Sequence, residues 1–280
     1  MKQDSKELSI YNKKAIAESN RLMKSVQNDL TRTELQLVLL IASQVEENDD
    51  DFINCHVSMV DLKKLLFPDS WKNKNTREQV EKIIISLASK VIVLKSGYNT
   101  KIFHWLDEAD IDDKKEFVSL RMGRFLKEYF LRLSKEERTI YKIGYILNFK
   151  RKTSINLYRW AYSKVNFCNG VSMSISDAKL EIANNPDVKT NDLFRYHIEP
   201  AVAEINEKSD LTITYLPKKA GGQKKQYTSI EFWINKKTNP KMPKLGIEKK
   251  NKENPLSEDE IIDIIDLEQE EIHDVLEVFK

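Results

Sequence analysis

Glycine, proline and cysteine are scarce in this sequence of 280 residues, and their scarcity narrows the choice of fold. Seven glycines and seven prolines are too few for a turn-rich all-β protein, so helices are favoured. The two cysteines, Cys55 and Cys168, lie far apart and form no Cys-x-x-Cys motif. This spacing argues against a disulfide framework and a cysteine zinc site, and it predicts a reduced, cytoplasmic setting.

Long apolar runs are missing as well. No run approaches the roughly 18 residues that a membrane-spanning helix needs. The N-terminal residues MKQDSKELSIYNKK contain no apolar core of the kind found in a secretory signal peptide. We therefore expect no membrane partner.

The motifs of several enzyme classes are also absent. No two histidines are two to four residues apart, which excludes a metal-binding pair and the histidine dyad of a tyrosine nickase; they are His56, His104, His197 and His273. No GxxxxGK(S/T), GxSxG or GxGxxG sequence occurs. His197 falls on the apolar side of its helix, where we expect a hydrogen-bonded core histidine. We expect no enzymatic activity, no cofactor and no bound metal.

The charge is distributed unevenly along the chain. Hydrophobic residues make up 40% and charged residues 32%, which suits a packed protein of about two domains. Residues 253–280 contain 11 acidic side chains and one lysine, a formal charge of −10; because the whole chain carries +2, residues 1–252 carry +12. A basic body predicts a polyanionic partner, with which the acidic segment would compete.

The stretch from Lys189 to Asn235 begins with an amphipathic helix. Its apolar side chains recur at helical spacing: Leu193, Phe194, His197, Ile198, Ala201, Val202 and Ile205. Asn191, Arg195, Tyr196 and Glu199 fall on the polar side, and Thr190 is the predicted N-cap. Pro200 lies inside the helix, where it removes a backbone hydrogen bond to the carbonyl of Tyr196 and predicts a bend.

A hairpin with a cationic tip follows this helix. Apolar side chains alternate on its two arms: Leu211, Ile213 and Tyr215, then Ile230, Phe232 and Ile234. Four lysines surround the turn at Gly221-Gly222: Lys218, Lys219, Lys224 and Lys225. A helix with a polar front and a hairpin with a basic tip are typical of a winged helix, which binds the DNA major groove and the adjacent phosphates. The alternative is that these charges are simply solvated.

The rest of the chain predicts the same order of elements twice: helix, strand, helix, helix, hairpin. The first copy comprises 34–46, 52–58, 59–67, 76–89 and 91–105, and the second 155–167, 171–176, 177–183, 189–208 and 211–235. The two copies share their element order and not their residues, so the repeat signal is weak. These patterns predict a helix-rich α+β fold of two tandem winged-helix domains with β-hairpin wings.

Local signals mark several boundaries. Thr31 with Glu34, and Thr76 with Gln79, have the spacing of capping boxes, and Ser58 is a predicted N-cap. Residues 8–28 are expected to be helical and the acidic residues 107–116 to form a loop. Residues 257–279 predict a further helix, which either docks on the body or binds a partner.

Particular residues in this pattern resemble the iteron-plasmid replication initiators of the Rep_3 family. The most distinctive are Pro200-Ala201-Val202-Ala203-Glu204-Ile205-Asn206, followed by the hairpin that ends at Ile230-Glu231-Phe232. Residues 147–158 resemble the start of the family's second domain, and residues 12–34 its N-terminal region. The resemblance covers roughly residues 10–236 and leaves out the linker and the acidic segment.

The resemblance implies two winged-helix domains that bind direct repeats, the iterons, in double-stranded DNA at a plasmid origin. Family monomers open adjacent AT-rich DNA and help to recruit host replication proteins, including the host initiator and the replicative helicase. As dimers, members of the family repress the promoter of their own gene. The implied domains are residues 1–133, which contact DNA and dimerise; 134–236, which recognise the iteron; and 237–280, a linker and acidic helical tail.

The candidate DNA-binding residues are cationic or amide side chains, with one tyrosine, on the predicted helices, loops and wing. They are Lys72, Lys74, Asn75, Arg77, Lys150, Arg151, Lys152, Lys189, Asn191, Arg195, Tyr196, Lys218, Lys219, Lys224 and Lys225. Some family members carry several arginines on the second recognition helix, whereas this chain has only Arg195 there. Base readout is therefore expected to include Asn191, which can pair with adenine, and Tyr196.

Two other functions remain open. A tandem winged-helix transcription regulator would share the fold without initiating replication. A replication nickase is disfavoured by the missing histidine pair. A direct-repeat array beside an AT-rich tract, next to the gene, would distinguish the initiator from the regulator.

Overall fold

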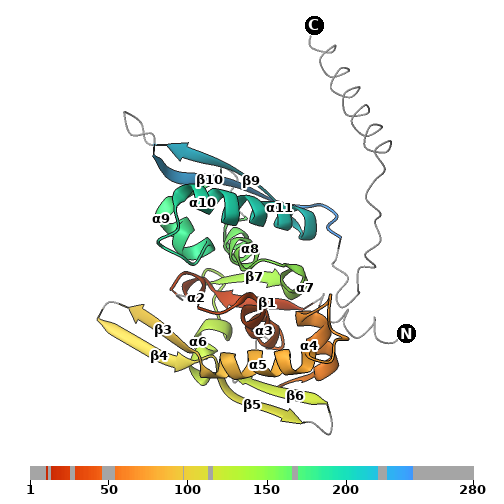
Figure 1. The fold of residues 1–280 in the computed structure, drawn as a ribbon. Helices are drawn as coiled ribbons and strands as arrows, with labels where there is room; N and C mark the ends of the chain where they lie inside the picture. Colours follow the sequence, from red (N-terminus) through yellow and green to blue (C-terminus); the bar gives the residue numbers. More distant parts are fainter. Residues whose placement is uncertain are drawn as a thin grey trace, which may run out of the picture. The chain divides into compact units, whose positions relative to one another are not determined.

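The computed structural model describes residues 11, 14–25, 29–45, 54–96, 98–112, 116–165, 170–219 and 226–241 (Figure 1). All of them belong to one compact unit, Met1–Ile247. None of the helices in these residues combines the length and the apolar character that crossing a membrane requires.

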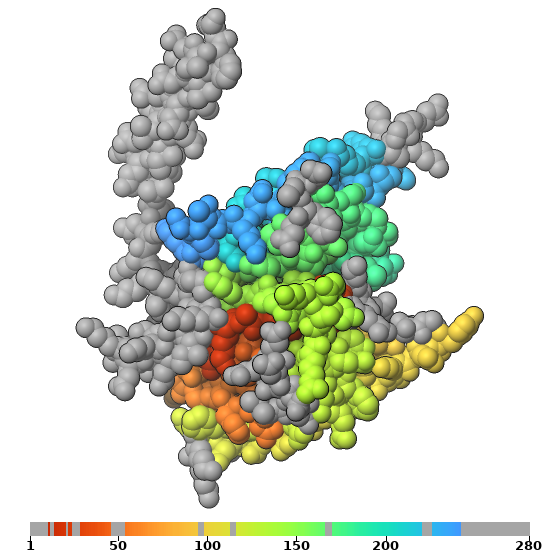
Figure 2. Space-filling model, turned by 180° about the vertical axis from the view of Figure 1, so that it is seen from behind, coloured from red at the N-terminus to blue at the C-terminus, as the bar shows by residue number. Residues whose placement is uncertain are grey.

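The first half of the chain contains the predicted order of elements. They are α3 (Arg32–Ala42), β2 (Cys55–Ser58), α4 (Met59–Leu66), α5 (Thr76–Ser89), β3 (Val91–Ser96) and β4 (Asn99–His104). The capping box of Thr31 and Glu34 is confirmed, and Ser58 Oγ accepts a hydrogen bond from the Asp61 N–H at 3.0 Å. Helix α3 is buried from Glu34 to Ala42, as its apolar sequence requires. Hairpin β3–β4 projects from the body (Figure 2).

The second predicted capping box, at Thr76, is wrong. Asn75 occupies the N-cap position without a side-chain hydrogen bond, and Thr76 is the first residue of α5. Thr76 is buried, and its hydroxyl donates to the carbonyl of Ser70 at 2.6 Å. The Thr76 hydroxyl is therefore used in the turn before the helix and not in a capping box. Threonine side chains often bond to nearby backbone groups in this way.

The acidic segment predicted as a loop is largely a strand. Strand β5 (Leu106–Asp112) pairs antiparallel with β6 (Phe117–Met122), which pairs with β2 on its other side. Because β5 lies at the edge of this sheet, its carboxylates reach solvent while its backbone is still paired. Charged residues are common on edge strands, where they also discourage pairing with other chains.

The helix predicted over residues 8–28 is wrong in its middle. Strand β1 (Ala15–Ser19) pairs antiparallel with β7 (Arg138–Lys142), and the helical part is α2 (Asn20–Ser25). Ile16 and Glu18 point to the same side of β1 and are both buried. The partner strand lies more than 100 residues away in the sequence, so local spacing could not reveal the pairing.

The middle of the chain supplies short helices and one long one. They are η1 (Arg124–Leu126), α6 (Lys127–Phe130), α7 (Ile143–Asn148) and α8 (Lys152–Lys164). Tyr158 of α8 is fully buried and meets the edges or faces of Tyr141, Tyr145 and Phe149, with ring centroids 5.3–6.2 Å apart. These aromatic contacts connect α8 to β7 and α7.

The second half repeats the order of elements, as predicted. They are β8 (Val171–Ser174), α9 (Ile175–Asp177), the π-helical η2 (Ala178–Ile182), α10 (Thr190–Asp192), the π-helical η3 (Leu193–Ile198), α11 (Glu199–Lys208), β9 (Leu211–Lys219) and β10 (Tyr227–Lys236). The sheet has the order β8-β10-β9. The predicted hairpin is confirmed: Ile213 pairs with Ile234, and Tyr215 with Phe232.

The two halves share one hydrophobic cluster. Gln36 of α3 reaches across to α7, where its amide donates to the carbonyls of Ile146 at 2.9 Å and Phe149 at 3.2 Å. Glu18 of β1 forms a buried ion pair with Arg159 of α8. The boundary between residues 133 and 134 stays a prediction, and β7 just beyond it completes a sheet with β1.

Candidate nucleic-acid interface

The helix predicted at Lys189 is built from three consecutive segments, α10, η3 and α11. Its back is buried as predicted, at Leu193, Ile198, Ala201 and Ile205. Its front carries Asn191, Arg195 and Tyr196, all exposed, with Tyr196 54% exposed. The structure therefore presents these three predicted base-reading residues to solvent on one rigid, core-anchored helix.

Pro200 is the second residue of α11 and directly follows the π-helical segment η3. Just before it, the Glu199 N–H donates to the carbonyl of Phe194, five residues back instead of four. A proline ring clashes with the carbonyl four residues earlier, and a wider π turn avoids that clash. A π turn contains an extra residue, so it also offsets the side chains on its two sides around the helix axis.

Thr190 is not the N-cap of this helix. Lys189 occupies that position, its side chain makes no capping hydrogen bond, and Thr190 is the first helical residue. Lys189 itself is exposed. The first turn of the helix thus has no side-chain cap and lies next to the Lys189 cation. Both features favour an anion near the helix N-terminus.

Arg195 is the most distinctive side chain of this face. Its guanidinium lies over the ring of Tyr196, 5.3 Å from the centroid. Among the described residues it forms no ion pair with a carboxylate. Its charge is thus held in place by a neighbouring ring and not neutralised, which leaves its donors free for a base edge or a phosphate.

His197 differs from its prediction. It is half-buried on the inner side of the helix, but within the described part of the chain its buried Nδ1 has no hydrogen-bond partner. Burial lowers the pKa of the imidazole, and the nearby Asp192 opposes that effect. Burial thus favours the neutral imidazole. The prediction of a hydrogen-bonded core histidine is therefore wrong for the buried Nδ1 atom.

An aromatic cluster links the helix to the wing. Phe194 stacks on Tyr215 of β9 with centroids 6.4 Å apart and meets Tyr227 of β10 edge-on at 5.1 Å. Lys219 lies over the ring of Tyr227 at 4.9 Å, and Lys218 pairs with Glu231 at 2.9 Å. The structure therefore brings the predicted helix and wing residues together. Lys224 and Lys225 lie outside the described residues.

The basic corner at the start of α8 is tied to both halves. The Lys150 N–H donates to Glu204 of α11 at 2.7 Å, while its ammonium pairs with Asp69 at 3.2 Å. Arg151 is exposed. Lys152 is half-buried, and burial is the main cause that lowers its pKa to about 8. At neutral pH this lysine carries most but not all of a charge, which makes it a weaker phosphate ligand than Arg151.

The candidate residues of the first half lie in the turn before α5 and on its first turn. Lys72, Lys74 and Asn75 are exposed, and the ammonium of Lys72 lies 5.4 Å from the centroid of the Trp71 ring. Arg77 pairs with Glu81 at 2.9 Å. Because Asp69 belongs to the same turn, its contact with Lys150 places this group beside the basic corner.

A second charged exposed residue of α5 is also paired: Lys82 binds Glu78 at 2.6 Å. The exposed face of α5 therefore carries internally compensated charge. The corresponding face of α10, η3 and α11 does not, since Arg195 has no carboxylate partner among the described residues. This difference between two helices in equivalent positions could not be read from composition.

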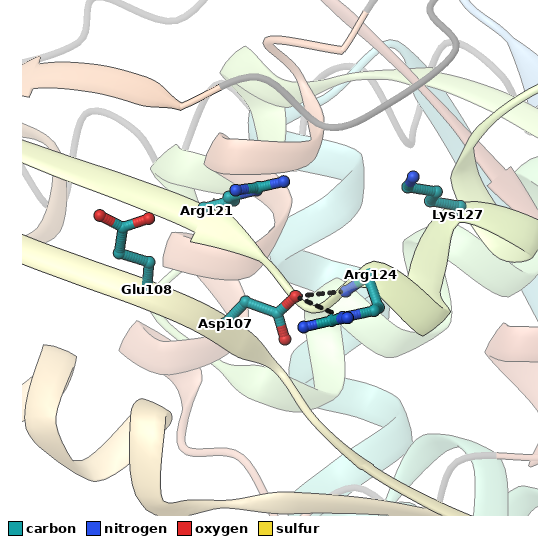
Figure 3. A pocket seen from close by; sticks show the side chains of 5 residues that line it. All are labelled: Asp107, Glu108, Arg121, Arg124 and Lys127. Atoms are coloured by element: carbon teal, nitrogen blue, oxygen red, sulfur yellow. Dashed lines mark hydrogen bonds and ion pairs between the residues drawn. The ribbon is translucent and has the colours of Figure 1, made fainter.

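A polar pocket that sequence reasoning missed lies between β5, β6 and η1, with a volume of about 370 Å³ (Figure 3). It is lined by Asp107, Glu108, Arg121, Arg124 and Lys127. Asp107 accepts a hydrogen bond from the Arg124 N–H at 3.0 Å and also faces its side chain. Its lining holds acids as well as bases, which gives it no clear preference for a ligand of one sign. In the described ranges no three His, Cys, Asp or Glu side chains gather as a metal site would require.

Two family models match the chain. The one described as "Initiator Replication protein, WH1" covers residues 15–162, and "Initiator Rep protein, WH2" covers 178–252. A similar solved structure is described as "Crystal structure of Pi initiator protein in complex with iteron DNA"; it is 12% identical, covers 80% of this chain and 98% of that one, and has a TM-score of 0.65. At that identity the likeness shows the fold. A comparison with curated proteins found no match.

The order of elements, the two matched models and the structural likeness agree on one architecture. The predicted fold of two winged-helix domains is therefore confirmed. The first model alone spans more than half of the sequence, and the predicted family resemblance is confirmed with it. This chain belongs to the Rep3 family of initiator replication proteins.

Proposed function

We propose that this protein initiates plasmid replication by binding direct-repeat iterons at the origin, without catalysing a reaction. Binding promotes opening of adjacent AT-rich DNA and recruitment of the host initiator and helicase. The family membership supports this proposal, and the similar Pi initiator is described in complex with iteron DNA. A dimeric form that represses the protein's own promoter belongs to the same proposal.

The observation that carries the proposal is the exposed front of the second recognition helix. Arg195 is positioned by Tyr196, and its charge is not compensated among the described residues. Asn191 lies one turn earlier on an exposed position. An arginine pairs with guanine and an asparagine with adenine in the major groove, so this face has the donors and acceptors that sequence readout needs.

We propose that the wing and the basic corner bind the DNA backbone. Lys219 and Lys218 lie on a hairpin that is packed against the helix through Phe194, and Arg151 is the N-cap residue of α8. Point charges of this kind contact phosphates and set the register of the helix, and they add little sequence discrimination. The turn from Lys72 to Arg77 would contribute further phosphate contacts from the first domain.

We keep the division into residues 1–133, 134–236 and 237–280 as a proposal about roles. The first part contacts DNA and forms the homodimer, the second recognises the iteron, and the third is a linker with an acidic tail. A tandem winged-helix regulator that does not initiate replication is the competing function. It would bind DNA through the same face, so the fold cannot separate the two.

Footprinting on DNA that flanks the gene tests the proposal. An initiator protects several direct repeats beside an AT-rich tract, and permanganate reveals unpaired thymines in that tract when the protein is bound. A regulator protects an isolated or inverted site and leaves the neighbouring duplex paired. Protection of no site by the full chain at low salt contradicts both functions. Arg195→Ala is the matched variant, because it should lose the repeats before it loses random DNA.

A further inference from the structure

The wing contains a β-bulge close to its basic end. The register of β9 and β10 shifts between Ser229 and Tyr227, so that Tyr227, and not Thr228, lies opposite Lys219. Ile230 is fully buried and points into the core. In a regular strand Tyr227, three positions before Ile230, would point to the opposite side, because successive side chains alternate. The bulge turns the Tyr227 ring to the core side, and bulges commonly redirect a side chain in this way.

On that side the Tyr227 ring contacts both the recognition helix and a cation of the wing. It meets Phe194 of η3 edge-on, with the ring centroids 5.1 Å apart, and the Lys219 ammonium lies 4.9 Å from its own centroid. Phe194 immediately precedes Arg195, the predicted base reader. One ring therefore lies between the two parts of the candidate interface.

The neighbouring Lys218 is placed differently from Lys219. Successive residues of a strand point to opposite faces, and Lys218 pairs with Glu231 at 2.9 Å on its own face. Lys219 is exposed and forms no ion pair within the described part of the chain. The exposed Glu199 of α11 acts on the same cluster, since it adds to the burial that raises the pKa of Tyr215, but no ion pair joins it to Lys219. A ring, and not a carboxylate, thus holds the Lys219 charge.

We propose that Tyr227 is a positioning residue of the wing: its ring, braced by Phe194, holds the Lys219 ammonium where it meets a DNA phosphate. This inference rests on the proposed function, because it assigns a role within the same DNA-binding surface. A lysine side chain is long and flexible, and fixing one only on binding reduces affinity by roughly two- to tenfold. A ring that orders the side chain beforehand removes this cost from the binding step.

The test compares Tyr227→Leu and Tyr227→Phe in the full chain, on a random-sequence duplex. Tyr227→Leu removes the ring and should weaken binding roughly two- to tenfold. Its slope of log K against log salt should be shallower than that of the parent, by at most about one, because the phosphate contact of Lys219 is made less often. Phenylalanine also attracts cations, so Tyr227→Phe should keep the affinity and the slope of the parent. Equal losses in the two variants overturn the role of the ring.

Two lysine backgrounds locate the effect. In Lys219→Ala, the additional change Tyr227→Leu should cost less than about twofold, because the cation that the ring positions is gone. In Lys218→Ala, which removes the neighbouring charge, Tyr227→Leu should keep its full loss. Equal further losses in both backgrounds overturn the assignment to Lys219.

The salt series separates positioning from a general loss of structure. A partly unfolded variant contains less active protein, which lowers the apparent affinity by the same factor at every salt concentration and leaves the slope unchanged. Thermal unfolding of each variant measures its stability independently. A Tyr227→Leu chain that binds more weakly with the slope of the parent therefore overturns the inference, whatever its melting temperature.

Failure of this inference can be told from failure of the proposed function. If the parent binds the duplex, and Tyr227→Leu binds it with the same affinity and slope, the positioning role is overturned while DNA binding stands. If the parent binds no duplex at low salt, the proposed function falls, and the positioning role falls with it.

Discussion

The Nε of Arg159 on α8 donates to the Oε2 of Glu18 on β1 at 3.0 Å, and the pair is buried. The Tyr141 hydroxyl donates to the same carboxylate. Burial opposes the charge on Arg159, but Glu18 outweighs it and raises the pKa of the guanidinium. This charged cluster joins β1 to α8, which lies more than 130 residues further along the chain.

Arg159→Met should lower the free energy of unfolding by about 3–5 kcal/mol, because it leaves the Glu18 carboxylate buried without its partner. The double variant Glu18→Leu/Arg159→Met should be less destabilised than Arg159→Met alone, since no buried charge remains. Urea unfolding of the parent, Arg159→Met, Glu18→Leu and the double variant measures this. If the double variant loses the sum of the single losses, the two side chains do not act as a pair.

Arg195→Ala should weaken binding to the iteron by about 1–3 kcal/mol and leave random-duplex affinity nearly unchanged, because a base contact discriminates between sequences. Paired titrations on iteron and scrambled duplexes measure the difference. Lys82→Ala on α5 is the control, since its charge is already paired with Glu78 and it should change neither. Equal losses on both duplexes for Arg195→Ala would exclude its role as a base reader.

Lys219→Ala on the wing should weaken iteron and random duplex by a similar factor and make the salt slope shallower by about one, as expected for one lost phosphate contact. Lys224→Ala, five residues further along the sequence, is expected to behave alike. Lys218→Ala should have the smaller effect, because Lys218 is paired with Glu231 at 2.9 Å. A sequence-dependent loss at Lys219 would show that the wing reads bases.

The body of the protein, with its +12 charge over residues 1–252, should bind DNA with strong salt dependence. For about six phosphate contacts, the slope of log K against log salt is about −5. Fluorescence anisotropy across a salt series measures it for the full chain. A flat slope would remove phosphate binding from the account.

Stability should fall in acid through Glu34. Burial alone would raise its pKa, but hydrogen bonds from Lys90, Ser86 and Thr31 outweigh this and lower the pKa to about 2. The unfolded chain, with the ordinary higher pKa, then binds the proton more readily. The stabilisation is therefore complete above about pH 5 and is lost as pH falls toward 2.

The size of that effect is on the order of 3 kcal/mol, from a pKa difference of two to three units. Urea unfolding of the parent and of Glu34→Gln at a series of pH values measures it. The variant should be less stable at neutral pH, and its stability should depend less on pH between 5 and 2. Parallel pH curves for the two chains would show that Glu34 is not the responsible group.

Patterns that depend on neighbouring residues were predictable from the sequence. The stripe from Leu193 to Ile205 follows from helical period, because side chains three and four residues apart share a face. The capping box at Thr31 and Glu34 closes within one turn, and the β9–β10 register follows from alternation around a short connection. The family resemblance rested on the same local stretch.

Other features required the folded chain. Residues 15–19 became a strand because β7, more than 100 residues away in the sequence, offers its backbone edge. Strand β5 pairs with the neighbouring β6, and the run of acids in its sequence concealed this hairpin. The hydroxyl of Thr76 was taken by Ser70, and the aromatic rings that bind the wing to the helix meet across two elements.

The candidate interface also has one part that the sequence predicted and one part that only the folded chain revealed. Sequence periodicity by itself determined which side of the Lys189 helix is polar, since an amphipathic helix must bury its apolar face. The pairing of Arg77 with Glu81 has the i,i+4 spacing that a helix sequence already suggests. Only the tertiary structure decided that the ammonium of Lys150 meets Asp69, 81 residues away in the sequence, because charge is neutralised by whichever group the fold brings within a few ångströms.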